Sequence, residues 1–303
     1  MSHDHGYVMI SSNWRGMSIF DIPVVVKLLA GDPNILVSIQ HNVMQGFAFK
    51  AGITHFCRNG LLKMDFMKFK KVPIQQSEEN PPKMIFYGIS QGGIVGSGYS
   101  TLLGPTKLLD GAALVSAGTP FSMIMSRSII FPKYHQLMLL NLAQNRHVRI
   151  FLSMMQMYYD SIEAGGILSS TRSEDRVKTL MQSGLGDSIV TTISGSILAR
   201  SYDASIFPSN PNKVFGLPIL SPDENTNSQC VFTEILYEEE LRTLPITNTD
   251  GKFNPVHLCV HSDPYAVGQL TRFINTGKFV DVCPPNGCRR ETSWGRWYDD
   301  FCF

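Results

Sequence analysis

The chain is 303 residues long, which allows one large domain or two smaller ones. Its hydrophobic fraction is 43% and its charged fraction 17%, a balance that excludes a mainly disordered chain. The net charge of +1 gives no electrostatic footprint for nucleic acid or an anionic membrane. No run of about 18 apolar residues predicts a membrane span, and the first residues lack the features of a signal peptide.

The first part of the chain alternates apolar runs with turn-forming residues. Residues 7–12 are a short apolar run that predicts a buried strand. Residues 22–29 and 35–56 are apolar-periodic segments that predict helices. The polar, proline-rich stretch 72–82 predicts a surface loop. The continuous apolar run 83–87 then predicts an interior parallel strand.

The rest of the chain repeats this alternation. A turn at 88–93 leads into a predicted helix at 94–103, and 110–116 predicts the next strand. The later predicted elements are a helical region at 120–172, a strand at 177–182, a helix at 188–202, a loop at 203–228, a strand at 230–236 and a helix at 264–275. Strands that alternate with helices predict an α/β fold, with a mainly parallel sheet and flanking helices.

A serine between two glycines is the strongest local signal for chemistry. Gly88-Ile-Ser90-Gln-Gly92 follows an apolar strand and precedes a helix, which is the setting of a nucleophile elbow. We expect the glycines because side chains two residues either side of Ser90 would collide. The helix N-terminus favours negative charge, so the Gln91 N–H is a candidate oxyanion donor. The alternative is a plain glycine-rich connection that holds a phosphate.

A serine nucleophile needs a base within hydrogen-bond reach and a group that orients the base. In nucleophile-elbow enzymes the acid and then the base follow the serine along the chain. Asp187 comes just after the strand at 177–182, at the edge where parallel sheets place their sites. It suits the N-cap of the next helix equally well. The other candidates for the acid are Asp160, Asp203, Asp223 and Asp263.

Two histidines, His257 and His261, follow the candidate acid. His257 lies in a predicted loop beyond the last strand, where the general base belongs. A rival interpretation makes both histidines metal ligands together with Asp263, but prolines on either side leave little room for a helix. The sequence therefore predicts a Ser90–Asp187–His257 triad, with no cofactor and no metal ion.

The chain resembles a little-characterised branch of exported bacterial α/β-hydrolases. Residues 87–94 look like the elbow of that superfamily. Shorter segments that are similar to this branch are 13–18, 155–160, 184–190, 254–257 and 273–277, the last followed by the Cys283/Cys288 pair. The resemblance implies an α/β-hydrolase core at 1–119 and 173–303, with a helical cap insertion at 120–172. It favours the two triad partners over their competitors and does not reveal a substrate.

In one respect the chain differs from the α/β-hydrolases that it resembles. An α/β-hydrolase has about three further strands before the one at 7–12, and a loop among them supplies a second oxyanion N–H. Nothing of that kind precedes Tyr7. We therefore expect an N-terminally shortened fold with one unpaired sheet edge and a rate about 10²–10³-fold lower.

The predicted function is a serine hydrolase that cleaves an ester or amide bond through an acyl-enzyme, with a small-molecule or peptide acyl substrate. The alternative is a catalytically weak or inactive binding module of the same fold, because the upstream oxyanion loop is missing. A redox or metal protein that uses Cys283, Cys288 and the histidine pair is a minor alternative. The sequence leaves the oligomeric state open.

Two other features bear on the compartment and the substrate. Cys283 and Cys288 flank a turn-forming Pro-Asn-Gly, which predicts either a disulfide or two free thiols. A disulfide would indicate an extracellular or other oxidising compartment, whereas zinc would need a second ligand pair nearby. The sulfur and aromatic side chains of 120–172 either line an apolar acyl pocket or pack the cap against the core. These are Phe121, Met123, Met125, Met138, Met154, Met155 and Met157.

Overall fold

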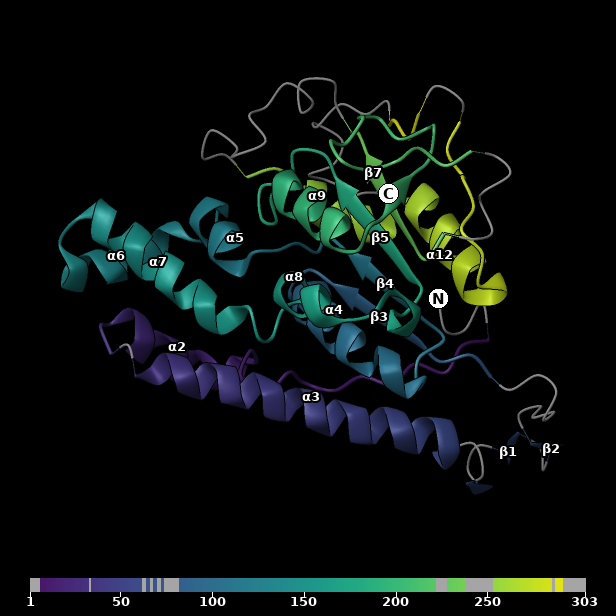
Figure 1. Cartoon of the computed structure of the whole chain (residues 1–303), viewed down its shortest axis with the longest axis horizontal. Helices are drawn as coiled ribbons and strands as arrows, with labels where there is room; N and C mark the ends of the chain where they lie inside the picture. The colour runs from purple at the N-terminus through teal and green to yellow at the C-terminus, as the bar shows by residue number, and fades with distance from the viewer. Residues whose placement is uncertain are drawn as a thin grey trace.

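The fold is of the α/β type, with a five-stranded parallel sheet flanked by helices (Figure 1). The computed structural model describes residues 6–32, 34–61, 64–65, 68–69, 72–73, 82–221, 228–237, 253–284 and 287–290. The predicted fold class is confirmed at this level.

The main sheet has the strand order β3-β4-β5-β7-β6, and each neighbouring pair is parallel. Its strands are β3 (Ile85–Ile89), β4 (Gly111–Val115), β5 (Thr179–Gly184), β6 (Ser205–Ile206) and β7 (Cys230–Ile235). Every residue of β4, β5 and β7 is buried, whereas Gly88 is the only fully buried residue of β3 at the sheet edge. The strands β3 and β4 are continuous apolar runs, which is typical of a parallel sheet that helices cover on both faces.

The helices follow the predicted order except in the segment between Pro255 and Pro264, where a loop is predicted and the short helix α11 (Val256–Cys259) carries His257 instead. They are α2 (Ile22–Leu29), α3 (Ile35–Asn59), α4 (Gln91–Leu103), α5 (Phe121–Arg127), α6 (Pro132–Leu142), α7 (Asn145–Tyr159), α8 (Ala164–Ile167), α9 (Thr192–Ser201), α11 (Val256–Cys259) and α12 (Pro264–Thr276). Short 3₁₀ turns are η1 (Ile19–Asp21), η4 (Gly104–Thr106), η5 (Leu168–Ser170), η6 (Ser173–Asp175) and η7 (Val260–Ser262). Within the described ranges, none of the helices combines the length and apolar character that a membrane crossing requires.

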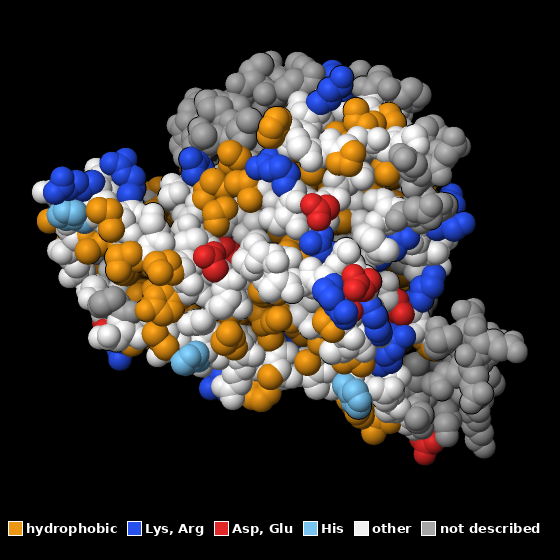
Figure 2. All heavy atoms as spheres, in the orientation of Figure 1, with side chains coloured by type: hydrophobic (Ala, Val, Ile, Leu, Met, Phe, Trp, Pro, Cys, Tyr) orange, Lys and Arg blue, Asp and Glu red, His pale blue; other side chains and the backbone are white. Residues whose placement is uncertain are grey.

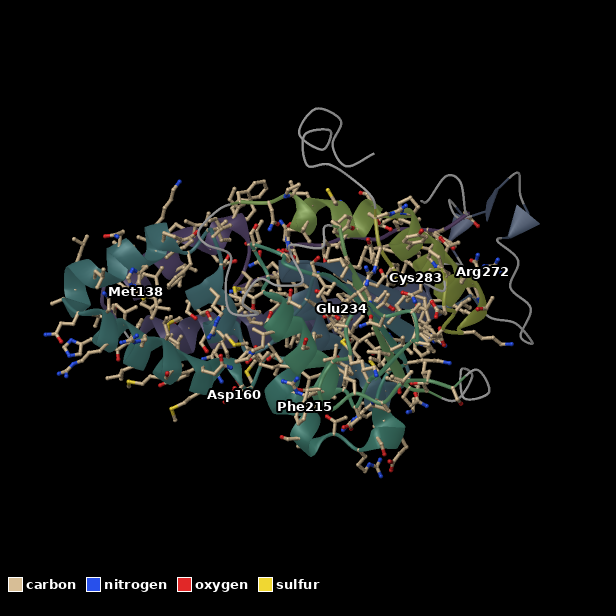
Figure 3. All side chains as sticks on the ribbon, turned by 90° about the horizontal axis from the view of Figure 1, so that it is seen from above. Met138, Asp160, Phe215, Glu234, Arg272 and Cys283 are labelled. Atoms are coloured by element: carbon tan, nitrogen blue, oxygen red, sulfur yellow. A yellow bond between two sulfur atoms is a disulfide. The ribbon has the colours of Figure 1, made fainter. Side chains whose placement is uncertain are left out.

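Alternating side chains of the strands pack against different helices. Leu114 of β4 belongs to a buried cluster with Leu198 of α9. Its chain neighbour Ala113 belongs to another buried cluster, with Leu270 of α12. Because successive side chains of a strand point to opposite faces, α9 and α12 lie on opposite sides of the sheet (Figure 3).

The helices α5 to α7 extend to one end of the molecule, where they lie beside α2 and α3 (Figure 1). Leu28 of α2, Ile39 of α3, Met138 of α6 and Leu152 of α7 share the largest buried cluster. The helical region at 120–172 therefore packs against the helices near the start of the chain. Its description as a cap insertion stays a prediction.

The predicted strand at 7–12 is wrong. These residues form no strand, and Val8, Met9 and Ile10 are at least half exposed. An apolar run becomes a strand only where another strand pairs with it, and here no pairing partner is present among the described residues. Side-chain hydrogen bonds hold both ends of the segment instead. The Tyr7 hydroxyl donates to Asn275 Oδ1 at 2.8 Å, and Lys50 Nζ donates to the carbonyl oxygen of Ser12 at 2.8 Å.

Two predicted loops contain short strands. Residues 72–82 begin with β2 (Val72–Pro73), which pairs with β1 (Lys68–Phe69) in a two-stranded antiparallel sheet. The central part of this loop, 74–81, lies outside the described residues. The loop at 203–228 begins with β6, the edge strand beside β7.

Cys283 and Cys288 form a disulfide, and their Cα atoms are 4.9 Å apart. Cys288 is fully buried, and its carbonyl oxygen accepts the N–H of Leu236 just after β7. Cys283 lies at the end of the molecule opposite to Met138 (Figure 3). The disulfide therefore closes a short loop after α12, and the hydrogen bond from Leu236 joins that loop to the end of β7.

Candidate active site

Ser90 occupies a sharp turn between β3 and α4. Its φ of 54° is positive, which is a strained conformation for a residue with a side chain. The turn is held by two backbone hydrogen bonds of 2.8 Å, from Ser90 N–H to the carbonyl oxygen of Val115 and from Ile94 N–H to that of Ser90. The adjacent strand β4 thus fixes the position of the serine.

The two glycines of the turn differ in what they permit. A Cβ atom at 88 would meet the carbonyl oxygen of Gly92 at 2.5 Å, so only glycine fits at this position. A Cβ atom at 92 would meet nothing nearer than the Trp14 Nε1 atom, at 3.9 Å. The expected collision therefore holds at Gly88 and not at Gly92.

His257 connects Ser90 to Asp187 through two short hydrogen bonds. Its Nε2 atom lies 2.8 Å from Ser90 Oγ, and its Nδ1 atom lies 2.7 Å from Asp187 Oδ2. The side chains of His257 and Asp187 are 7% and 0% exposed. A neutral imidazole protonated on Nδ1 donates to the carboxylate and leaves Nε2 free to accept the Ser90 proton.

Asp187 lies in the turn after β5, and both of its carboxylate oxygens have partners. Oδ1 accepts the N–H groups of Ile189 at 2.7 Å and Val190 at 3.0 Å, while Oδ2 faces His257. Asp187 is not the N-cap of α9, because that helix begins later and its N-cap is Thr191. The backbone bonds hold the carboxylate in the orientation that the imidazole needs.

The sequence reasoning missed Asn254, which joins the base to the acid. Its side-chain Nδ2 donates to the carbonyl oxygen of Gly186 at 2.8 Å, next to Asp187. Its carbonyl oxygen accepts the Ser188 hydroxyl at 3.3 Å. The signal in the sequence was an asparagine directly before a proline, three residues before His257.

The hydrogen bonds that join Ser90, His257 and Asp187 do not include the side chain of His261. Its Nδ1 atom is buried and has no hydrogen-bond partner. Burial lowers the pKa of His261, and the nearby His257 lowers it further. No group of three or more His, Cys, Asp or Glu side chains in the described residues could hold a metal ion.

The other aspartates lie in different settings. Asp160 is exposed at the edge of the molecule (Figure 3). Asp203 has a side chain that is 79% exposed and pairs with an arginine. Asp263 is fully buried in an ion pair with Arg290 and is the N-cap of α12. Asp223 lies outside the described residues.

Gln91 is the first residue of α4, so its N–H has no carbonyl partner within the helix. The N–H lies beside Ser90, where the helix dipole adds partial positive charge. The Gln91 side chain donates to the carbonyl oxygen of Met17 at 3.0 Å and ties the elbow to the segment before α2.

A cavity of about 470 Å³ opens beside Ser90, and most of its lining is apolar. Of the sulfur and aromatic residues expected to line an acyl pocket, Phe121, Met125 and Met155 do so. The others are Met123, Met138, Met154 and Met157. Of these, Met138 is fully buried in the core, and Met154 and Met157 are exposed. Three members of the group therefore line the cavity and Met138 packs in the core, whereas the exposed Met154 and Met157 do neither.

No protein-family model matches the chain, and no curated protein is similar enough in sequence to count as a relative.

Proposed function

We propose that this chain is a serine hydrolase with an α/β-hydrolase type of fold, which cleaves an acyl ester or amide bond through an acyl-enzyme on Ser90. The observation that carries the proposal is the pair of hydrogen bonds, 2.8 and 2.7 Å long, that runs from Ser90 through His257 to Asp187. The histidine is 167 residues from the serine and 70 from the aspartate along the chain. A nucleophile, a base and an orienting acid in this contact form the arrangement that activates a serine.

In the proposed reaction, His257 Nε2 accepts the Ser90 proton as Ser90 Oγ attacks the carbonyl carbon of the substrate. Asp187 holds the imidazole in position and stabilises the imidazolium that forms. The Gln91 N–H donates to the oxyanion, and the N-terminus of α4 adds partial positive charge there. His257 then gives its proton to the leaving oxygen or nitrogen.

The second half of the reaction uses the same groups. The leaving group departs and Ser90 keeps the acyl group as an ester. Water enters, His257 accepts one of its protons, and the hydroxide oxygen attacks the acyl carbon. The tetrahedral intermediate collapses, His257 returns the proton to Ser90 Oγ, and the carboxylic acid leaves.

The fold supports the same proposal. Ser90 lies in a strand–turn–helix elbow between β3 and α4. Asp187 follows β5, which is the third strand across the sheet. The chain order of serine, acid and base is that of nucleophile-elbow enzymes. The burial of the acid and the base keeps water from competing for their hydrogen bond.

An active-site fluorophosphonate probe tests the proposal. We expect one probe per chain on the wild type, no labelling of Ser90→Ala, and full labelling of Ser100→Ala. Ser100 is a buried serine on the same helix, so it is a matched control. A folded wild type that resists the probe, or a Ser90→Ala variant that still takes it up, would overturn the proposal and favour a binding module.

A further inference from the structure

The cavity beside Ser90 has a chemically uniform wall. Its volume is about 470 Å³, and none of the described residues that line it carries a charge. Most of the lining side chains are aliphatic, aromatic or thioether groups. Besides Ser90, the polar lining residues are Ser18, Gln91, Ser128 and two tyrosines. Such a wall offers a large contact area to an apolar ligand and few partners to a polar one.

The apolar wall begins at the nucleophile. Ile94 lies one helical turn after Ser90, and Val190 follows Asp187 in the acid turn. Both side chains pack with Ile124 of α5 in a small buried cluster, and all three line the cavity. A substrate group attached to the reacting carbonyl therefore meets hydrocarbon directly beside Ser90.

The far wall reaches into the core of the molecule. Four buried residues line this part of the cavity, each no more than 6% exposed. They are Leu28 and Leu29 of α2, Phe131 directly before α6, and Met155 of α7. All four belong to the largest buried cluster. The cavity is thus lined both by the reacting serine and by side chains of the core, which suits an apolar group that extends from the serine into the core.

The position of His257 decides which half of the substrate enters the cavity. The leaving group must lie beside His257 Nε2, because that atom donates its proton. Neither His257 nor any other residue of α11 lines the cavity, whereas Gln91, which carries the candidate oxyanion N–H, and Ile94 do. The group that stays on the serine, the acyl group, is therefore the one that faces the cavity.

We propose that the cavity binds the aliphatic chain of a fatty-acyl substrate, so that the acyl-enzyme carries a medium or long hydrocarbon chain. This inference rests on the proposed function. At about 30 Å³ for a group the size of a water molecule, the volume holds roughly fifteen such groups, enough for a long alkyl chain. A peptide in the same place would bury amide groups that this wall leaves largely without partners.

The exposed part of the cavity lining is also apolar. Ile19, Ile22 and Ile130 line the cavity and are 74%, 50% and 57% exposed. An alkyl chain that enters from water would contact hydrocarbon before it reaches the buried wall. The free energy of removing the chain from water therefore favours binding along its whole length.

A series of p-nitrophenyl esters tests the inference. We expect kcat/KM to rise from acetate through butyrate and octanoate toward dodecanoate, by up to about fourfold per methylene until the chain fills the cavity. A series that is flat or falls beyond butyrate would overturn the inference. In a second series, acetate esters of alcohols of increasing length should show no such rise. A rise there would place the chain in the leaving group and contradict the acyl assignment.

A matched pair of variants tests the location. Met125 and Met123 are both half-buried methionines on α5, and Met125 alone of the two lines the cavity. Met125→Trp should lower the dodecanoate-to-acetate ratio of kcat/KM by at least about tenfold, since the larger side chain displaces several methylenes. Met123→Trp should keep the wild-type ratio. Equal ratios in the two variants would overturn the proposed position of the chain.

Binding to a chemically inert variant separates the two proposals. Ser90→Ala should bind dodecanoate saturably in calorimetry, and adding Met125→Trp should weaken this binding by at least about tenfold. If the fluorophosphonate labels Ser90 but dodecanoate does not bind and the ester series is flat, only the chain-binding inference fails. If Ser90 is not labelled yet dodecanoate binds with this dependence on Met125, the hydrolase proposal fails and a fatty-acid binding cavity remains.

Discussion

The candidate site joins two regions that are built in different ways. The sheet side contributes Ser90, Asp187 and His257 from the turn after β3, the turn after β5 and α11, and connects them by short hydrogen bonds. The helical side contributes the uncharged cavity wall from η1, α2 and α5 to α7. In the proposed function, the sheet side carries out the reaction and the helical side selects the substrate.

The two regions also differ in how closely the sequence specifies them. On the sheet side, a Cβ atom at Gly184 would collide with the side chain of Val256, beside the base. On the helical side, α7 is apolar on its outer face as well, where Ile150, Met154 and Met157 are exposed, and hydrophobic side chains gather over α6 and α7 (Figure 2). We therefore expect single substitutions to affect chemistry strongly on the sheet side and selectivity on the helical side.

Removal of the base, His257, should lower the activity more than any other substitution discussed below. We expect His257→Ala to lower kcat on p-nitrophenyl acetate by about 10⁶-fold, because Ser90 then has no proton acceptor. His261→Ala is the matched control and should retain most of the activity. A small loss in His257→Ala, or an equal loss in both variants, would contradict the role given to His257.

A change in the acid should have the next largest effect. In Asp187→Asn the amide can still accept the N–H groups of Ile189 and Val190, but it presents an N–H group to His257 Nδ1. The imidazole then carries its proton on Nε2 and cannot accept the Ser90 proton, so kcat should fall by about 10⁴-fold. The denaturation midpoint should change little. An active Asp187→Asn variant would show that the carboxylate is only structural.

Each region also holds a buried carboxyl group with a raised pKa. Burial raises the pKa of Glu163 on the helical side and of Glu234 in β7 from 4.5 to about 7. The folded state therefore keeps protons that the unfolded state releases. The stability contribution is fully present below about pH 4.5 and is lost as the pH rises through about 7.

Glu234→Gln should separate these two contributions. The amide can still accept the 3.0 Å hydrogen bond from Asn210 Nδ2 and does not ionise. Between pH 5 and pH 8, the free energy of unfolding should fall in both proteins. The fall should be larger in the wild type than in the variant, by on the order of 3 kcal/mol. Urea denaturation at both pH values measures this difference, and the remaining slope reports on Glu163. Identical slopes in the two proteins would contradict the raised pKa of Glu234.

The disulfide offers the mildest test of the sheet side. The double variant Cys283→Ser/Cys288→Ser should lower the free energy of unfolding by about 2 kcal/mol, because the short loop gains freedom in the unfolded state. The acyl-chain preference should stay unchanged, since neither cysteine lines the cavity. Denaturation under non-reducing conditions measures the loss. A shifted chain preference would show that the two regions are coupled.

Local patterns predicted most of the sheet and the members of the triad. The apolar runs around Tyr87, Leu114 and Phe232 became strands of the sheet, and the two around Leu114 and Phe232 are buried along their whole length. The glycines around Ser90 marked the elbow, and chain order pointed to Asp187 and His257. These signals are local, or depend only on the order of the elements.

The sequence-based predictions failed for features that depend on contacts between residues far apart in the sequence. The apolar run at 7–12 could not reveal that no strand pairs with it. Nor could the methionine-rich segment reveal that Met125 faces the cavity while Met154 faces solvent, because the cavity exists only where α2 meets α5 and α7. Asn254 was missed for the same reason, since its partners lie in the acid turn.

The most direct test of the account is to identify the residue that carries the acyl group. A slowly released p-nitrophenyl dimethylcarbamate, followed by peptide mass spectrometry, should place one carbamoyl group per chain on Ser90 and none on the His257→Ala variant. A carbamoyl group on another residue, or no carbamoyl group on a protein that hydrolyses p-nitrophenyl acetate, would contradict the account.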